Sequence, residues 1–184
     1  MFSNFKSKAD IRSTTPVKSS AQRNIKTKVV ELYPGLTPYV DEIIPKKSQL
    51  TLSKCEDRIS LYSVDNRVVF FQSFDDDLIP ALRLVHLYPD AFPSVRVDRG
   101  AIKFVLSGAN VMAPGMTSAG GMLPETLDIN KVVVIRAEGK EHAVAVGVTK
   151  MTAEEMRTKN KGHGVDTAHY LGDWLWKLEA GEST

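Results

Sequence analysis

Only one cysteine, Cys55, occurs among the 184 residues of the chain. A single thiol cannot form a disulfide within the chain, and it cannot make a structural zinc site that needs two or more thiolates. The N-terminal segment contains no apolar core of the kind that a secretory signal requires. We therefore expect a protein of the reducing cytoplasm, with no bound metal and no cofactor.

Long apolar runs are also missing. No run approaches the roughly 20 residues that a membrane-spanning helix needs, so no association with a membrane is expected. Apolar residues nevertheless make up 42% of the chain, which is enough for a packed core and argues against wholesale disorder. The length suits one domain of about 150 residues or two smaller domains.

Catalytic patterns are absent from the sequence. Ser107 is not part of a nucleophile elbow, because that pattern needs a glycine two residues before the serine. The glycines of this region are too widely spaced for a phosphate-binding loop. No histidine lies two to five residues from another, which disfavours a zinc pair; the four are His86, His142, His163 and His169. We expect a binding protein and no enzyme.

Hydrophobic periodicity predicts an α+β fold. A helix is predicted from Ser19 or Ser20 to about Tyr33, and a second one begins at Thr37-Pro38. Residues 1–5 are expected to form an edge strand or a tether. Three strands and one tight hairpin turn follow; the strands are Gln49–Lys54, Ile59–Val64 and Val68–Ser73, and the turn is Asp65-Asn66.

The acidic run Asp75-Asp76-Asp77 has two interpretations. Three consecutive acids on a regular element cannot all face one metal ion, so an ion site is disfavoured. Acids at a helix N-terminus are favoured by the helix dipole, and residues 78–87 fit a helix with Pro80 in its first turn. We therefore predict that these acids begin a helix.

The rigid connector from Tyr88 to Pro93 follows, and we place a domain boundary near Phe92.

The stretch from Val97 to Gly115 is the most informative in the chain. Asp98 can accept hydrogen bonds from the amides at positions 100 and 101, and so begin a helix. Apolar residues recur at helical spacing up to Ser107-Gly108, where a glycine in the left-handed conformation ends the helix with least strain. A short strand over residues 109–113 and a break at Pro114-Gly115 complete a compact helix–turn–strand unit.

Basic charge is concentrated near the N-terminus. Residues 1–30 carry seven basic side chains and one acid, a net charge of +6, whereas the whole chain carries +2 and the remainder therefore −4. A local basic face attracts phosphate even on a nearly neutral molecule. A solvated helix face together with a floppy arm is an equally good interpretation of the same charges.

Short motifs along nearly the whole chain carry a family resemblance. In the second half they are Gly100-Ala101, Gly108-Ala109, Pro114-Gly115 and residues 143–147. Elsewhere they are Tyr33-Pro34-Gly35, Ile44-Pro45-Lys46-Lys47, Leu82-Arg83-Leu84, Tyr88-Pro89 and His169-Tyr170-Leu171. The second half resembles a PUA domain, a small RNA-binding β-barrel. The whole chain resembles a fungal member of the malignant T-cell amplified sequence 1 family.

The resemblance implies a fold in two parts. Residues 1–92 are expected to form an N-terminal α/β domain with a small antiparallel sheet, and residues 93–184 a PUA-type β-barrel (pseudobarrel). In that barrel the apolar runs 132–135 and 142–149 are strands, and Thr152 to Glu155 form a capping box that opens a helix. Residues 169–178, which include both tryptophans, are expected to close the barrel.

The resemblance also implies a function. The family looks like a ribosome-associated translation factor of the small subunit. Its implied partner is density-regulated protein, which contributes a domain like an initiation factor. The pair would release deacylated tRNA from the small subunit and promote subunit recycling and translation reinitiation. Any zinc is expected on the partner.

Candidate RNA contacts follow from the residues and from the resemblance. Phosphate recognition needs cations, and Arg96, Arg99 and Lys103 lie around the central unit. Phe104 can stack on a base, but Phe104 and at least one tryptophan are better explained as barrel core. The resemblance adds groove residues and two lysines for ribosomal RNA phosphates; they are Gly108, Ala109, Pro114, Gly115, Lys46 and Lys47.

Two other functions stay open. The chain can be an RNA-binding subunit of a tRNA or rRNA modification system, because PUA modules often accompany such enzymes. Against this, the acids of the N-terminal half, Asp57, Asp65 and residues 75–77, lie in turn-like settings. A scaffold that binds only proteins is the other possibility. RNA binding that weakens steeply with salt separates a scaffold from an RNA-binding factor.

Overall fold

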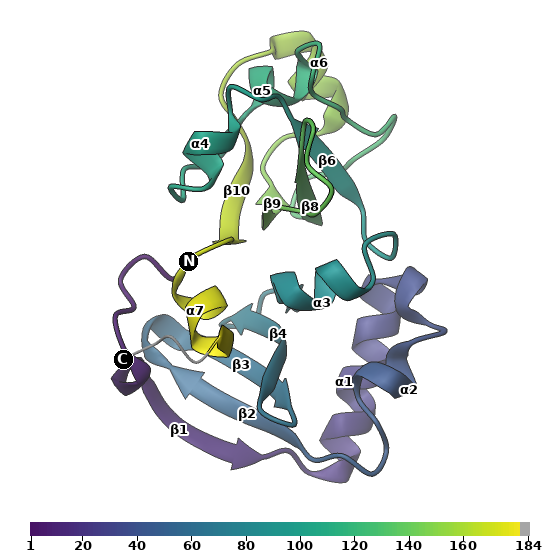
Figure 1. The fold of residues 1–184 in the computed structure, drawn as a ribbon. Coiled ribbons are helices and arrows are strands. Elements are labelled where there is room, and N and C mark those ends of the chain that lie inside the picture. The colour runs from purple at the N-terminus through teal and green to yellow at the C-terminus, as the bar shows by residue number, and fades with distance from the viewer. Residues whose placement is uncertain (181–184) are drawn as a thin grey trace.

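Two five-stranded sheets, one in each half of the chain, organise the computed structural model, which describes residues 1–180. Figure 1 shows them one above the other, with the helix α3 between them. The expected α+β class is confirmed: a small antiparallel sheet comes first and a curled half-barrel sheet second. Within the described residues, no helix has both the length and the apolar character to cross a bilayer.

The first sheet is antiparallel with strand order β1-β2-β3-β4-β5. Its strands are β1 (Ile11–Pro16), β2 (Leu50–Cys55), β3 (Ile59–Val64), β4 (Arg67–Ser73) and β5 (Ile79–Pro80). The three strands predicted for residues 49–73 are thus confirmed. Their hairpin turns at Asp65 and Asn66, which both have positive φ, as a tight two-residue turn requires.

Helices of the first half lie mainly on one side of this sheet. They are α1 (Ser19–Leu32), α2 (Val40–Ile43) and α3 (Leu82–Leu87), with 3-10 turns η1 (Lys8–Asp10), η2 (Pro34–Leu36) and η3 (Glu56–Arg58). The helix predicted from Ser19 is confirmed, whereas the second helix is a single turn that begins at Val40.

The second sheet has strand order β6-β8-β9-β10-β7, and only β6 and β8 are parallel. Its strands are β6 (Ser94–Val97), β7 (Val111–Met112), β8 (Val132–Ala137), β9 (Ala145–Thr149) and β10 (His163–Tyr170). Residues 132–135 are buried, as the apolar run predicted.

Short helices surround the second sheet. They are α4 (Ile102–Val105), α5 (Ala113–Thr117) and α6 (Ala153–Lys159), and a last helix, α7 (Trp174–Ala180), follows the sheet in the chain. The capping box that begins α6 is confirmed, because the Thr152 hydroxyl accepts from the Glu155 amide and the Glu155 carboxylate accepts from the Thr152 amide. The expected break at Pro114-Gly115 is wrong: both residues lie in α5, where proline occupies the first turn.

Of two predictions for the first half, one is decided between its alternatives and the other is wrong. Residues 1–5 are a tether and form no edge strand: Phe2 and Phe5 are buried in the core, and the edge strand is β1. The acidic run 75–77 does not begin a helix. Residues 79–80 pair with Phe70 and Phe71 as an edge strand, where a proline without an N–H is tolerated, and α3 begins only at Leu82.

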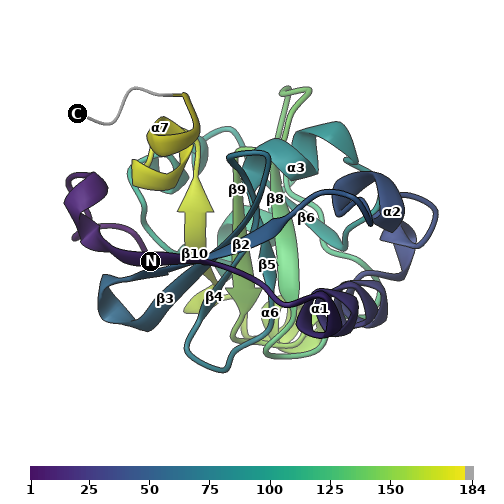
Figure 2. The ribbon, with the colours of Figure 1, turned by 90° about the horizontal axis from the view of Figure 1, so that it is seen from below.

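The C-terminal helix departs from its expected place. Residues 163–170 do complete the barrel sheet as β10. Helix α7 then leaves the barrel and packs on the first half, where the Trp174 ring lies 5.7 Å from Phe2 and 4.8 Å from Phe5 between centroids. Figure 2 shows α7 and α1 on opposite sides of the molecule. One core cluster therefore joins both halves, because it includes Val134 and Val146 of the barrel sheet together with Phe70 of β4.

Candidate nucleic-acid interface

A basic groove lies on the second half, between α4 and the turn that joins β8 to β9. It has a volume of about 360 Å³. Arg99 and Lys103 line it, as does Lys140 from the opposite turn, together with a single carboxylate, Glu138. Three cations converge there from segments almost 40 residues apart, which is the electrostatic arrangement that attracts a phosphate chain.

Local hydrogen bonds fix the wall of the groove. The Ala101 amide donates to Asp98 Oδ1 at 2.9 Å, as expected, and the Ser118 hydroxyl donates to Asp98 Oδ2 at 2.6 Å. The Arg99 amide donates to Glu138 Oε2 at 2.8 Å. The carboxylate thus fastens the β8–β9 turn to the start of the α4 segment, so the cations of the two segments face one groove.

The segment after α4 adopts the conformation that the sequence predicts. Gly108 has a φ of +87°, and a β-carbon there would lie 3.0 Å from the Tyr170 ring. The Ser107 hydroxyl donates to the Phe104 carbonyl at 2.7 Å, closing the helix end locally. The exposed Ala109 accepts a hydrogen bond at its carbonyl from the Thr167 hydroxyl at 2.9 Å. The chain therefore crosses close over β10 at this point.

Phe104 does not belong to the barrel core, so its predicted role is wrong. Its side chain is 55% exposed on α4, and the Lys103 ammonium lies 4.9 Å from the centre of its ring. The prediction failed because Val105, the next residue, takes the buried position of this short helix. An exposed ring beside cations is the arrangement that stacks on unpaired bases. Leu106 is also exposed and lines the groove itself.

The remaining candidates of the second half lie outside the groove lining. Arg96 is exposed on β6 and donates from Nε to the Gly120 carbonyl at 3.1 Å. Pro114 is exposed in the first turn of α5. Gly115 packs against the start of the α4 segment, where its carbonyl accepts from the Asp98 amide at 2.8 Å. The structure therefore gathers Arg99 and Lys103 at one groove and gives Gly115 a positioning role.

A second basic surface lies on the first half. A cavity of about 460 Å³ separates α1 from the turn 45–48, and Arg23, Lys26 and Lys46 supply all of its charged lining. Lys26 pairs with Asp41, and this hydrogen bond lowers the pKa of the Asp41 carboxyl. Lys47 is exposed on the same turn but does not line the cavity. Lys46 and the basic helix thus share one face.

Gln22 positions this second surface, and the sequence analysis missed it. Its side chain is buried on α1, and Nε2 donates to the carbonyls of Pro45 at 3.4 Å and Ser48 at 3.2 Å. Its Oε1 accepts from the Leu50 amide at 3.3 Å. One amide therefore ties the lysine-bearing turn to the basic helix. In the sequence, the only available signal was a glutamine that stands among the charged residues of the predicted helix.

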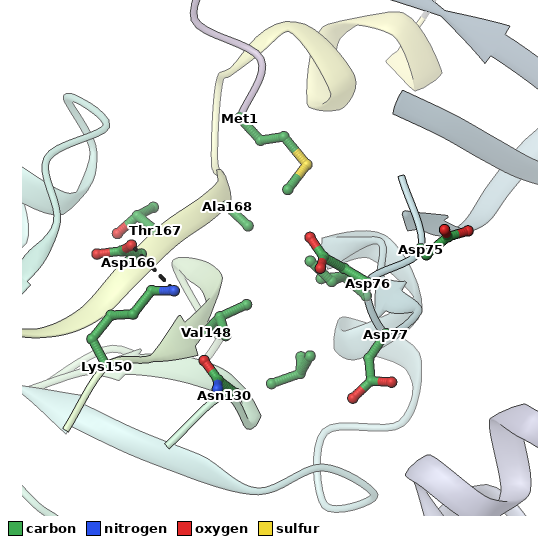
Figure 3. A pocket seen from close by; sticks show the side chains of 12 residues that line it. Met1, Asp75, Asp76, Asp77, Asn130, Val148, Lys150, Asp166, Thr167 and Ala168 are labelled. Carbon is green, nitrogen blue, oxygen red and sulfur yellow. Dashed lines mark ion pairs between the residues drawn. The ribbon is translucent and has the colours of Figure 1, made fainter. Parts of the chain in front are cut away.

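A cavity of about 570 Å³ lies between the two halves and is acidic (Figure 3). Asp75, Asp76 and Asp77 line one side, and Asp166 lies opposite, 3.8 Å from the Lys150 ammonium. Among the described residues, no three His, Cys, Asp or Glu side chains are arranged to hold a metal ion. The acidic side chains of the cleft therefore repel phosphate.

Two histidines that are far apart in sequence lie close together, and one of them, His86, is part of helix α3. The rings of His86 and His142 lie 5.3 Å apart, and His86 Nε2 is 2.8 Å from the Ala143 carbonyl. Burial lowers the pKa of His86, so the neutral form is favoured and Nε2 donates the hydrogen bond. His86 therefore helps to hold α3 against the segment that contains Ala143.

Comparison with known domains defines the class of protein. A Pre-PUA-like domain matches residues 5–89, and a PUA domain matches residues 93–171. The half-barrel with its basic groove is the second of these. The chain is therefore a PUA-domain protein with a pre-PUA half.

Curated relatives narrow this class to one family. Translation machinery-associated protein 20 of Schizosaccharomyces pombe is 58% identical over 177 residues, or 96% of this chain and 98% of that protein. The Saccharomyces cerevisiae protein of the same name is 56% identical over 97% of this chain and 98% of its own length. Malignant T-cell-amplified sequence 1 of Rattus norvegicus is 42% identical over 95% of this chain and 96% of its own length. The chain belongs to this family, as its motifs predicted.

Solved structures of archaeal proteins share the fold. The hypothetical protein PH0734.1 of Pyrococcus horikoshii superposes with a TM-score of 0.74 at 21% identity, covering 91% of this chain and 99% of that one. A conserved PUA domain protein of Thermoplasma acidophilum has a TM-score of 0.66 at 22% identity, covering 90% of this chain and 98% of that one. At this identity the likeness establishes the fold alone.

Proposed function

We propose that this chain is a non-enzymatic translation factor that binds RNA of the small ribosomal subunit. With density-regulated protein as its partner, it promotes the release of deacylated tRNA, subunit recycling and translation reinitiation in the cytoplasm. The names of its relatives, translation machinery-associated protein 20 above all, support the association with translation. The matched PUA domain supports the binding of RNA.

The observation that carries the proposal is the distribution of charge over the structure. Cations gather at two separate places, the groove with Arg99, Lys103 and Lys140 and the cavity with Arg23, Lys26 and Lys46. An acidic cleft lies between the two halves. Such a distribution fits two RNA segments held at once better than one duplex laid across the whole surface, because the cleft would repel the phosphates between them.

The two basic surfaces have different chemistry and suit different RNA elements. The groove on the PUA half supplies cations, and the exposed ring of Phe104 lies beside its Lys103; an aromatic face binds unpaired bases such as those at an RNA end. We assign to it the tRNA or a single-stranded ribosomal segment. The surface with Lys46 and Lys47 offers cations and no exposed ring among its lining residues. We assign to it the phosphates of ribosomal RNA.

Sedimentation tests the proposal directly. The full chain, alone and with density-regulated protein, is centrifuged with purified small subunits at about 50 mM salt, where phosphate contacts are strongest. We expect comigration with the subunit, and less of it for the variant Lys46→Glu/Lys47→Glu. Lys131→Glu, an exposed lysine on the other half, is the matched control.

Three outcomes would contradict the proposal. The absence of comigration at low salt, with the partner present, would remove the ribosome from the function. A new modified base in tRNA incubated with the purified protein would favour the alternative, a modification system. Binding to the partner without any salt-dependent binding of RNA would leave a protein scaffold.

A further inference from the structure

A sequence motif before helix α1 matches the substrate pattern of one class of kinase. Thr15 is followed by Pro16, and Lys18 stands three positions after the threonine. Proline-directed kinases require a proline directly after the acceptor, and one class of them also reads a basic side chain two residues further on. The sequence contains one other Thr-Pro pair, Thr37-Pro38, and no Ser-Pro pair. The residue three positions after Thr37 is Val40, so only Thr15 satisfies the whole pattern.

The structure presents Thr15 as such a kinase needs it. Thr15 is exposed, and it lies on β1, which pairs only with β2 and forms the outer edge of the first sheet (Figure 1). Protein kinases bind their substrates as extended segments, and this strand is already extended. The hydroxyl of the preceding Thr14 is 2.8 Å from the Ser53 hydroxyl, whereas that of Thr15 makes no hydrogen bond within the described residues.

We propose that Thr15 is a phosphorylation site for a proline-directed kinase that reads a basic residue at the third position after the acceptor. The Thr15 oxygen attacks the γ-phosphorus of ATP and forms a new P–O bond. The bond from that phosphorus to the β,γ-bridging oxygen breaks, ADP leaves, and the hydroxyl proton passes to the kinase's catalytic base. The product carries about two additional negative charges at neutral pH.

The surroundings of Thr15 suit a phosphate. Helix α1 has 14 residues, and its N-cap residue Lys18 makes no side-chain capping hydrogen bond. The first turn of this helix contains no acid. A phosphate a few residues before the helix can therefore attract both the Lys18 ammonium and the positive end of the helix dipole.

The consequence for RNA binding rests on the function proposed above. Ser19, which lines the basic cavity with Arg23 and Lys46, lies four residues after Thr15. Four residues of chain span at most about 14 Å, well inside the screening length of about 30 Å at 0.01 M salt. The phosphate thus lowers the positive potential of the N-terminal basic surface and weakens its contact with RNA phosphates. Phosphorylation would act as a negative regulator of that contact.

The first experiment tests the modification alone. The full chain is incubated with ATP and a purified cyclin-dependent kinase, and the modified residue is identified by peptide mass spectrometry. We expect one phosphate at Thr15. The variant Thr15→Ala should abolish it, Lys18→Ala should slow it at least about tenfold, and Thr37→Ala should leave it unchanged. Phosphate at Thr37 instead, equal labelling of Lys18→Ala, or no labelling would overturn the proposal.

The second experiment tests the regulation. Binding of the phosphorylated and unmodified proteins to a fluorescent fragment of small-subunit RNA is compared at about 10 mM salt, with a phosphatase-treated sample as control. We expect about three- to tenfold weaker binding after phosphorylation and a smaller salt dependence, because one or two phosphate contacts are offset. Equal affinities would refute the regulatory role and leave the modification standing. If the unmodified protein binds no RNA, the proposed function fails, and the labelling result is unaffected.

Discussion

The two cores of the molecule are built from different side chains. The cluster that joins the first half to α7 contains seven buried aromatic residues; they are Phe2, Phe5, Tyr33, Phe70, Phe71, Phe92 and Trp174. The buried cluster inside the half-barrel contains only valine, isoleucine, alanine and methionine, with Tyr170 packed at its border. Large aromatic rings fill the first core. The second core is filled by smaller side chains between strands that approach each other closely.

The difference predicts how each core fails. In the half-barrel, β9 and β10 approach so closely that a β-carbon at Gly147 would lie 2.5 Å from the Asp166 carbonyl oxygen. Added atoms have no space there and force the strands apart. In the first core, removal of a ring leaves a cavity and loses its burial. We therefore expect the first half to be most sensitive to truncation and the second to enlargement.

The largest effect is expected for Phe2→Ala. Phe2 is 4% exposed, and its ring lies 5.5 Å from Phe5, 5.2 Å from Phe71 and 5.7 Å from Trp174. We expect the free energy of unfolding to fall by about 3–5 kcal/mol. Urea denaturation followed by tryptophan fluorescence measures this change, because Trp174 is part of the same cluster.

Phe74→Ala is the matched control for the truncation. This ring is 61% exposed and contacts the Arg58 guanidinium at its surface. Its removal should cost less than about 1 kcal/mol. Equal losses for the two variants would mean that Phe2 does not join α7 to the first half.

The next largest effect is expected for enlargement at Gly108. A valine there must adopt a φ of +87°, and its β-carbon meets the Tyr170 ring at 3.0 Å. The left-handed conformation costs about 1–2 kcal/mol, and the crowding adds to it, for a total of about 2–4 kcal/mol. Thermal denaturation followed by circular dichroism gives the loss of stability.

Gly162 separates the two contributions to that loss. Its φ is +86°, but nothing lies within 4 Å of a β-carbon placed there. Gly162→Val should therefore lower the free energy of unfolding by about 1–2 kcal/mol, which is the conformational strain without the crowding. If the two variants are equally stable, the contact with Tyr170 is not tight, and the half-barrel is more tolerant of enlargement than the comparison of the cores implies.

Local sequence signals predicted the elements whose hydrogen bonds are local. The Asp65-Asn66 turn, the Thr152 capping box and the positive φ of Gly108 each depend on residues at most a few positions apart. Propensity and capping act at that range, so a single sequence contains them. The apolar run 132–135 was equally clear, because a strand buried on both faces has no polar side.

The errors concern residues whose partners are distant. Residues 75–77 resemble a helix start, but the pairing of residues 79–80 with β4 prevents a helix there. Phe104 was expected in the barrel core because it is aromatic, and residues 169–178 were expected to close the barrel because they carry both tryptophans. The sequence could not show that Phe104 is exposed or that α7 packs on Phe2 and Phe5 instead. The candidate site was affected in the same way. Lys140 reaches the groove from a turn that is distant in sequence and is held to the α4 segment by hydrogen bonds such as that from the Arg99 amide to Glu138.

A smaller effect, dependent on pH, is expected at the junction of the two halves. The half-buried His86 has its pKa lowered by burial, with a smaller contribution from His142 and Arg83. The folded protein therefore binds this proton less readily than the unfolded chain, and stability falls as the pH drops below about 6.5. His86→Gln keeps a donor toward the Ala143 carbonyl and should flatten the loss between pH 7 and 5.

Thermal melts at several pH values measure that slope. The exposed His163→Gln is the control and should keep the slope of the unchanged protein. A slope that survives in His86→Gln would assign the acid sensitivity to other groups. The His86 side chain at the junction of the two halves would then make no special contribution to the loss of stability at low pH.

The smallest effect on stability, and the largest on binding, is expected for Lys103→Glu. Lys103 is exposed on α4 and packs into neither core, so the free energy of unfolding should change by less than about 0.5 kcal/mol. Charge reversal in a groove with Arg99 and Lys140 should weaken RNA binding and reduce its dependence on salt. Fluorescence anisotropy with a single-stranded RNA, measured across a salt series, gives both quantities.

Lys131→Glu makes the same charge change at an exposed position outside that groove. If both variants weaken binding equally, RNA responds to the net charge of the half-barrel, and Lys103 is not part of a defined site. A selective effect of Lys103→Glu means that position matters more than total charge. The cations of the groove are exposed and belong to neither core, so they can change without cost to either core. Stability and binding then depend on separate sets of residues in this fold.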